Sequence, residues 1–301
     1  MACEPQGFDD WRIPLDSTIS RAQYEALVGH PRFAAAARQL SRSMLDLAAA
    51  DPALDGIVKD AGRFLATGLA VYLHATGGLT LARLKELGAR DRVVSPGRAR
   101  AILIYLRFLH YVAPAPDGGR AARFVPTPQL ERAYHAILRG GIEAAAVIEP
   151  KLERLSNRLG EPHVAADLVR ISGRIGLSHS GNNDGNPMWR VFLNRHAGAQ
   201  ILHALMLAAE DDGHYPPRGE MAFSLTGLAR TFRVSRPHVA RLLRAAEQEG
   251  LIVMRPDSRL AFTQAGHEAA RDVLGARLSG AMRTAITLMQ ALDAGAVAAA
   301  G

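Results

Sequence analysis

The sequence predicts a mainly α-helical protein of about two domains, for three reasons. The chain has 301 residues, 48% of them hydrophobic, which is enough for a substantial core. Strand signals are confined to two short pairs of segments, each joined by a turn. Elsewhere apolar residues recur at helical spacing, as in Phe33, Leu40, Met44 and Leu47 and again in Leu274, Leu278, Met282, Ile286 and Met289.

The two strand pairs belong to an internal repeat, whose second copy is the clearer one. A short helix near 224–232 is followed by a longer helix that begins at Ser235 and runs to Gly250. Two strands, Leu251–Arg255 and Arg259–Thr263, come next, with a Pro-Asp-Ser turn between them. The predicted order is therefore helix, helix, strand, turn, strand.

The first copy of the repeat follows the same order. A short helix over 79–87 precedes a longer helix that begins at Ser95, and a strand pair with a glycine-rich turn closes the copy. Ser95 lies 140 positions before Ser235, whereas Thr127 lies 136 positions before Thr263, because the turn of the first copy is four residues longer.

The second copy resembles the winged helix-turn-helix of bacterial transcriptional regulators, most closely the MarR-like kind. The resemblance covers about 224–263 well and 79–127 more loosely. The residues that carry it are Leu228-Ala229, Val234-Ser235-Arg236, Val239, Leu242-Leu243, Gly250-Leu251-Ile252 and the turn between Met254 and Phe262. It implies a mainly α fold with two winged helix-turn-helix units, each of three helices and a small β-wing, joined by long bridging helices.

The repeat and the resemblance together suggest five segments along the chain. We expect N-terminal helices over 1–60, a first winged-helix unit over 61–140, bridging helices over 141–196, a second winged-helix unit over 197–263 and a C-terminal helix over 264–301.

The long helix of the second copy has one apolar face and one basic face. Ser235 is a natural N-cap, and Pro237 fits the first turn, where a missing N–H costs little. At 100° per residue, Val239, Leu242, Leu243 and Ala246 lie opposite Pro237, Arg241, Arg244 and Gln248. Arginine can bind guanine edges and glutamine can pair with adenine, so the second face suits a DNA major groove.

Further candidate DNA contacts flank this face. Arg236 and His238 lie at the helix start, where backbone amides and cations meet phosphate. Arg255 and Arg259 flank the turn of the strand pair, where a wing tip would reach a minor groove or the DNA backbone.

In the first copy the candidate contacts are Ser95, Arg98, Arg100 and Arg107 on the long helix, and Arg120 and Arg123 in the wing. This helix is apolar almost all round, with Ile104, Tyr105 and Phe108 outside its main apolar face, so we expect burial on more than one face. Either only the N-terminal end of this helix contacts DNA, or the first unit serves for packing and does not contact DNA.

The charge distribution favours a polyanionic partner. The whole chain carries a formal charge of +7 and has a pI near 10. Seven arginines face three acidic residues in 224–263, and nine cations face three acidic residues in 79–127, so the excess is concentrated in the two copies. The partner that these charges indicate is double-stranded DNA.

Other classes of protein are less consistent with the sequence. The single cysteine, Cys3, leaves no internal disulfide and no cysteine-based zinc finger. No Walker loop, Rossmann glycine fingerprint, His-Glu-x-x-His or Gly-x-Ser-x-Gly motif occurs, so we expect no enzyme, no cofactor and no metal. His203 is expected to be an ordinary histidine, and Trp189 an ordinary core residue. A small-molecule effector between helices stays an open alternative.

The cellular location expected from the sequence is the cytoplasm, at the nucleoid. The first residues lack a basic segment followed by an apolar one, so they do not predict a signal peptide. The longest strongly apolar run, 101–106, is far shorter than the roughly 20 residues of a membrane span.

The sequence therefore predicts a sequence-specific, double-stranded DNA-binding transcriptional regulator that is not an enzyme. Its two copies could act on one site as a covalent pseudo-dimer, and whether the chain also forms a homodimer is open. Two alternatives remain. One is a plasmid-type replication initiator, which also pairs two winged helices, and the other is a tandem winged-helix scaffold for protein interaction.

Overall fold

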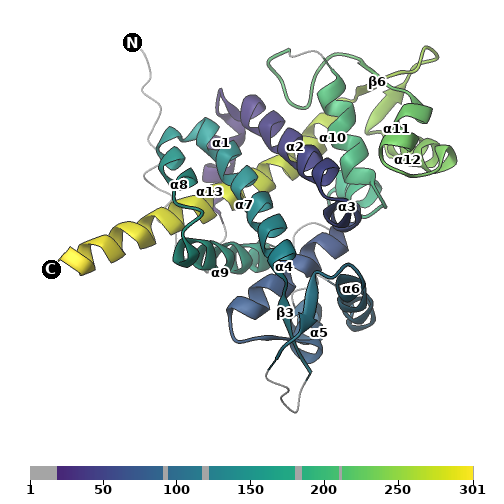
Figure 1. Ribbon diagram of the computed structural model, residues 1–301. Helices are drawn as coiled ribbons and strands as arrows, with labels where there is room; N and C mark the ends of the chain where they lie inside the picture. Colours follow the sequence, from purple (N-terminus) through teal and green to yellow (C-terminus); the bar gives the residue numbers. More distant parts are fainter. Residues whose placement is uncertain (1–18, 91–93, 117–121, 180–184, 210–211, 301) are drawn as a thin grey trace, which may run out of the picture.

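The computed structural model describes residues 19–90, 94–116, 122–179, 185–209 and 212–300, and it is mainly helical with few short strands (Figure 1). The chain begins with four helices, α1 (Arg21–Gly29), α2 (Phe33–Ala50), α3 (Pro52–Val58) and α4 (Ala61–Ala75). Side-chain oxygens of Ser20, Asp51 and Asp60 accept hydrogen bonds from first-turn N–H groups and so define where α1, α3 and α4 begin.

The first unit combines two helices with a three-stranded antiparallel sheet. Its elements are β1 (Leu79–Thr80), α5 (Leu81–Arg90), α6 (Pro96–Phe108), β2 (Val112–Pro114) and β3 (Arg123–Pro126), and the strand order is β1-β3-β2. The predicted strand pair is confirmed. The expectation of a helix starting at residue 79 is wrong by two residues, because Leu79 and Thr80 pair with β3 before α5 begins.

The second unit has the same elements in the same order. They are β4 (Met221–Ala222), α11 (Leu225–Thr231), α12 (Arg236–Gln248), β5 (Ile252–Met254) and β6 (Arg259–Phe262), and the strand order is β4-β6-β5. The expected helices and the expected strand pair are therefore all present. The short strand β4, like β1, was not predicted.

The repeat extends to individual hydrogen bonds. Ala113 faces Val125 across β2 and β3, as Val253 faces Ala261 across β5 and β6. The hydroxyl of Thr127 donates to the carbonyl of His110 at 2.9 Å, and that of Thr263 donates to the carbonyl of Gly250 at 2.5 Å. His110 and Gly250 both have a positive φ, 56° and 68°. The sequence repeat is therefore also a structural one.

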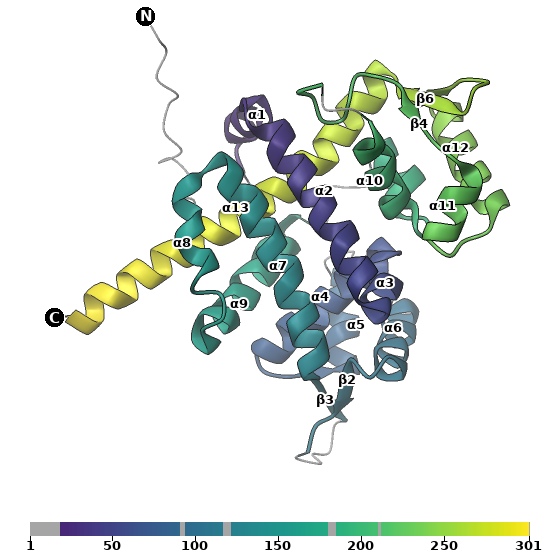
Figure 2. The same cartoon turned by 45° about the horizontal axis from the view of Figure 1, so that its top comes forward.

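Further helices and two short helical turns connect and flank the two units. They are α7 (Pro128–Ile148), the 3₁₀ turn η2 (Pro150–Leu152), α8 (Glu153–Ser156), α9 (Pro162–His179), the π-helical turn η4 (Trp189–Leu193), α10 (Gly198–Ala208) and the 37-residue α13 (Gln264–Ala300). The last of these runs from the second unit past α2, α7 and α9 toward the opposite end of the molecule (Figure 2). Among the described residues, no helix combines the length and apolarity that crossing a membrane requires.

Two clusters of buried apolar side chains form the core. One lies in and around the first unit and includes Leu84, Ile102, Leu106 and Tyr111. The other joins the second unit to the long helices and includes the apolar stripe Leu274, Leu278, Met282 and Ile286 of α13, which confirms that prediction. Phe33 and Leu40 of α2 are buried in the same cluster, while Met44 and Leu47 pack against the other one. The segment boundaries expected from the sequence stay predictions.

Candidate nucleic-acid interface

Helix α12 begins and packs as its sequence predicts. The Ser235 hydroxyl accepts a hydrogen bond from the backbone N–H of His238 at 3.2 Å, and Pro237 occupies the first turn. The face that packs on the rest of the unit is made of Val239, Leu242, Leu243 and Ala246, which are all buried. This packing leaves the opposite face of the helix to solvent.

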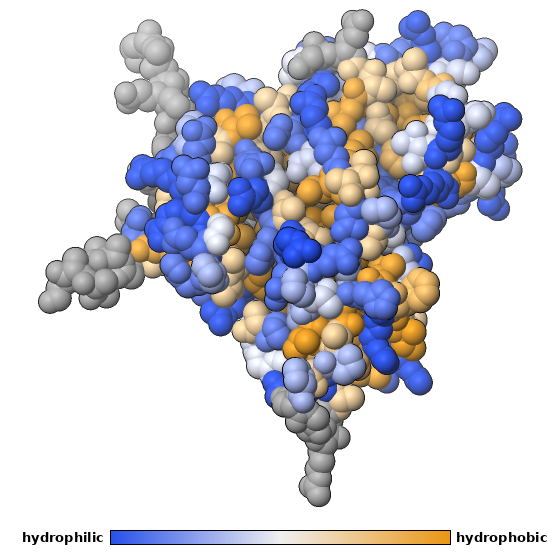
Figure 3. Space-filling model, in the orientation of Figure 1, coloured by the Kyte–Doolittle hydropathy of each residue, from blue (hydrophilic) through white to orange (hydrophobic). Residues whose placement is uncertain are grey.

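The solvent face of α12 carries basic and amide side chains. Arg236, Arg241, Arg244 and Gln248 are all exposed, as is Pro237. The guanidinium of Arg241 donates to the carbonyl of Pro237, one turn earlier, at 3.3 Å. No described carboxylate lies within ion-pair distance of these three arginines. The face is hydrophilic in the space-filling view, at the upper right (Figure 3).

The acidic residues at the end of α12 are engaged elsewhere. Glu247 accepts a hydrogen bond from the backbone N–H of Met254 at 3.0 Å. Glu249 forms an ion pair of 2.9 Å with Arg190 of the turn η4. Glu247 therefore joins α12 to β5 and Glu249 joins it to η4, which leaves the positive charge of the exposed face without a counter-ion from the helix.

His238 occupies a different place from its neighbours in the first turn. Its Nε2 lies 2.8 Å from the backbone carbonyl oxygen of His196, just before α10, and so carries the proton that this acceptor needs. The rings of the two histidines meet edge to face, with 6.4 Å between centroids. His238 is therefore turned toward the rest of the protein, away from the arginine face.

The two arginines of the second strand pair have acidic partners. Arg255 lies 3.4 Å from Glu220, and Arg259 lies 3.7 Å from Glu220 and 3.2 Å from Asp257. All four side chains are at least 40% exposed, so these pairs are weak and exchange easily with other partners. Glu220 lies outside the segment counted as basic, and its effect on the tip was not predicted.

The candidate residues of the first unit are distributed differently. Ser95 caps α6 by accepting from the N–H of Arg98 at 3.3 Å, while the guanidinium of Arg98 pairs with Asp60 at the start of α4. Arg100 is exposed, and Arg107 lies over the ring of Phe124, 5.7 Å from its centroid.

In the strand pair of the first unit, Arg123 is exposed on β3. Arg120 lies outside the described residues, and so does most of the glycine-rich turn around it. The basic contribution of this strand pair therefore rests on Arg123 alone within the part that the structure describes.

One expectation for α6, burial on more than one face, is wrong in part. Ala99, Ile102, Leu103 and Leu106 are buried, and Tyr105 is half-buried and packs against the same cluster. Ile104 and Phe108, one turn apart, are 55% and 76% exposed. Figure 3 shows the resulting hydrophobic patch over α6, at the lower right. The sequence shows that this helix is apolar, but which face the rest of the chain leaves uncovered depends on tertiary packing.

A short chain of contacts joins the first turns of α6 and α12. Asp60, which pairs with Arg98 of α6, directly follows Lys59, whose carbonyl accepts from the N–H of Ala197 at 2.7 Å. His196, the preceding residue, accepts from His238 of α12. The two corresponding helices of the repeat are thus both fixed to one junction, made of residues 59–60 and 196–197.

Two further arginines extend the basic surface of the second unit. Arg230 lies at the end of α11, and Arg233 follows in the turn that leads to α12, with a positive φ of 52°. Both are exposed. Their position between the two helices of the unit was a signal available in the sequence, but the expected contacts were limited to the second helix and the wing.

A comparison with known protein families, with curated proteins and with solved structures finds no match for this chain. Among the described residues, no group of three or more His, Cys, Asp or Glu side chains is arranged to hold a metal ion.

Proposed function

We propose that this chain is a sequence-specific, double-stranded DNA-binding transcriptional regulator of the winged helix-turn-helix kind, with α12 and α6 as its two recognition helices. In this account β5 and β6 form one wing and β2 and β3 the other. The protein acts at the nucleoid, and the repeat supplies two DNA-reading units in one polypeptide, as a pseudo-dimer.

The observation that carries the proposal is the exposed face of α12. Three arginines and one glutamine share it, no described acidic side chain pairs with it, and the opposite face is fully buried. A helix of this shape and charge fits a major groove, where arginine reads guanine and glutamine reads adenine. A face that was only a solvated surface would be expected to intersperse acidic residues with the basic ones.

The common junction supports the action of both units on one site. Because α6 and α12 are held through residues 59–60 and 196–197, their relative orientation is set by the chain itself. Two recognition helices that act on one face of DNA lie about one helical turn apart, roughly 34 Å. The units differ in their exposed residues, so the preferred site is an imperfect palindrome or asymmetric.

The proposal is tested by selecting duplexes from a library of fragments of the source genome and measuring their affinity for the protein. The variant Arg241→Ala/Arg244→Ala should bind the selected duplex less tightly. Each of its two substitutions should lower the affinity by about 5- to 150-fold, because each arginine is worth about 1–3 kcal/mol of base contact. Preference for the selected duplex over a scrambled one should fall as well.

The matched control removes the same charge from another surface. Arg154 and Arg174 are exposed on α8 and α9, outside both proposed recognition helices and both strand pairs. The variant Arg154→Ala/Arg174→Ala should keep its affinity within a factor of about three. Equal losses in the two double variants would mean that only net charge matters, and no selected duplex at all would refute the proposal.

A second candidate function is favoured by one observation, the exposed Ile104 and Phe108 on α6. Apolar patches of this kind mark protein interfaces, and a tandem winged-helix scaffold would use α6 to hold a protein. The variant Phe108→Ser separates the two functions. A regulator selects a duplex in the wild type and keeps in this variant the duplex selection that α12 provides. A scaffold selects no duplex in the wild type and loses its protein partner in this variant.

A further inference from the structure

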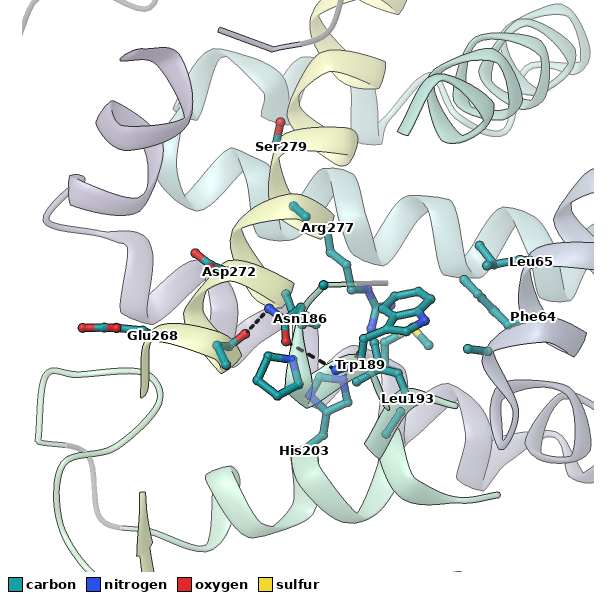
Figure 4. A pocket seen from close by; sticks show the side chains of 18 of the residues that line it. Phe64, Leu65, Asn186, Trp189, Leu193, His203, Glu268, Asp272, Arg277 and Ser279 are labelled. Carbon is teal, nitrogen blue, oxygen red and sulfur yellow. Dashed lines mark hydrogen bonds between the residues drawn. The ribbon is translucent and has the colours of Figure 1, made fainter. Parts of the chain in front are cut away.

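A large cavity lies between the helices that join the two units. Its volume is about 890 Å³, within the range of sites for small organic ligands. It is lined by residues of α1, α2, α3, α4, α9, α10 and α13 and by the turn η4. Figure 4 shows Arg277 of α13 and His203 of α10 reaching toward each other beside Trp189. The cavity thus has a polar centre within a mostly apolar wall.

The guanidinium of Arg277 is the unusual feature of this cavity. Burial lowers the pKa of Arg277 to about 10, so the group keeps its charge at neutral pH. Its hydrogen-bond partner among the described residues is the imidazole of His203, with 3.4 Å between Nη1 and Nε2. No described carboxylate pairs with it. Arg277 is half-buried, so its charge has lost part of its hydration and has gained no counter-ion from the described residues.

The imidazole of His203 adds a hydrogen-bond donor to the same place. Because Nε2 accepts from Arg277, the ring proton lies on Nδ1. His203 is only 4% exposed, and its Nδ1 has no hydrogen-bond partner among the described residues. A buried donor without an acceptor has lost its hydration without compensation.

Two more lining residues have buried polar atoms without partners. Gln200, one turn before His203, gives its amide N–H to Asp55 at 3.0 Å, and this leaves its Oε1 unpaired. Ser279 is 1% exposed and its hydroxyl is also unpaired. Of the six such atoms found in the described residues, three therefore belong to the lining of this cavity.

The acidic residues of the lining do not neutralise Arg277. Asp272 accepts a hydrogen bond from the hydroxyl of Tyr24 at 3.0 Å, and Glu268 accepts one from Gln264 at 2.7 Å. Both are exposed, and Figure 4 shows them on the far side of α13 from the Arg277 guanidinium. The positive centre of the cavity is thus available to a ligand.

We propose that this cavity binds a small organic acid, with its carboxylate against the guanidinium of Arg277 and its apolar part against Phe64, Leu65 and Trp189. A carboxylate accepts hydrogen bonds from the guanidinium and supplies the counter-charge that the arginine lacks. The apolar wall favours an organic acid over an inorganic anion, because only a ligand with an apolar part removes this wall from water.

The test compares organic acids with their uncharged amides by isothermal titration calorimetry on the full chain. The probes are 4-phenylbutyrate and octanoate, each against its primary amide. At least one acid should bind ten times more tightly than its amide, or better. The variant Trp11→Phe keeps Trp189 as the one tryptophan of the chain. Because Trp189 lines the cavity, its fluorescence should change when that acid binds there.

Two variants locate the charge that matters. Arg277→Met should remove the tenfold preference for the acid, whereas Arg277→Lys should retain part of it. The control is Arg21→Met, because Arg21 also lines the cavity but is exposed and paired with Glu25. It should leave the preference intact.

Several outcomes would overturn the proposal. These are equal binding of acid and amide by the wild type, an unchanged preference in Arg277→Met, or an unchanged Trp189 signal. The comparison of acid with amide uses the wild type alone, so it decides the matter even if Arg277→Met fails to fold. None of these results depends on whether the protein binds DNA.

Discussion

The Nε2 atom of His238, in the first turn of α12, lies 2.8 Å from the backbone carbonyl oxygen of His196. This contact anchors the corresponding helix of the second unit to the segment that precedes α10. Through the hydrogen bond between Ala197 and Lys59, the same segment reaches Asp60 and the first turn of α6. Each of the two helices is thus held at its N-terminal end, and their basic side chains beyond the first turn remain exposed.

The junction predicts unequal effects of two substitutions at Asp60. This carboxylate pairs with Arg98 and also caps α4 by accepting from the N–H of Arg63 at 2.8 Å. Asp60→Ala loses both interactions and should reduce the free energy of unfolding by about 1–2 kcal/mol. Asp60→Asn keeps a capping oxygen and should cost less than about 1 kcal/mol. Urea unfolding measures both, and equal losses would show that the cap contributes nothing.

His203 predicts a specific dependence of stability on pH. Burial and the nearby Arg277 lower its pKa from 6.5 to about 3. An unfolded histidine titrates near 6.5, so below that pH the unfolded chain gains a proton that the folded chain does not bind. The contribution to stability is therefore fully present above pH 6.5 and is lost as the pH falls toward 3.

The measurement compares wild type with His203→Gln by urea unfolding at pH 7.5 and pH 5.0. Between these values the wild type should lose about 2 kcal/mol more than the variant, from about 1.4 kcal/mol per pH unit below 6.5. Other histidines with lowered pKa, such as His196 and His267, are present in both proteins and cancel. Parallel losses in the two proteins would contradict the buried, neutral state of His203.

Two glycines predict stability changes of opposite sign. A Cβ added at Gly250 or at Gly280 would meet no other atom within 4 Å, so only the backbone differs. Gly250 ends α12 with a φ of 68°, and Gly250→Ala should destabilise the protein by about 1 kcal/mol. Gly280 lies inside α13, and Gly280→Ala should stabilise it by about 0.5–1 kcal/mol. The measurement is the Tm of each variant. A shift of Tm in the same direction for both variants would contradict the positive φ of Gly250 or the helical conformation of Gly280.

Much of each unit was predictable because local signals determine it. Ser95 and Ser235 mark where α6 and α12 begin, each with a proline in the first turn. The burial of Leu242 and Leu243 follows from their spacing, and the strand pairs follow from short apolar segments around a turn. These features depend on residues within a few positions of one another.

The contacts that join distant segments were not predictable from one sequence. Arg98 meets Asp60 and His238 meets His196 across 38 and 42 positions, and no pattern in the sequence relates them. Arg277 stands between apolar residues of α13 and has the pattern of an ordinary exposed arginine. Its place beside His203 depends on how α10 packs against α13, which local periodicity does not determine.

The strand pair of the second unit, β5 and β6, predicts a gain of affinity. Glu220 pairs with Arg255 and Arg259 and places a negative charge beside the tip proposed to approach DNA. Glu220→Gln should tighten binding of a selected duplex by up to about fivefold at low salt, since exposed pairs are worth about 0.2–1 kcal/mol. Fluorescence anisotropy checks this, with Glu153→Gln on α8 as the control. Unchanged or weaker binding by Glu220→Gln would place the tip away from the duplex.

The most direct test of the central claim is the salt dependence of duplex binding by the wild-type chain. The account places at least six cationic side chains near phosphates, so affinity for a selected duplex should fall on the order of a thousandfold between 50 and 200 mM salt. Binding should also saturate at one chain per duplex, because both units lie in one polypeptide. A flat salt response, or no binding at 50 mM salt, would contradict the account.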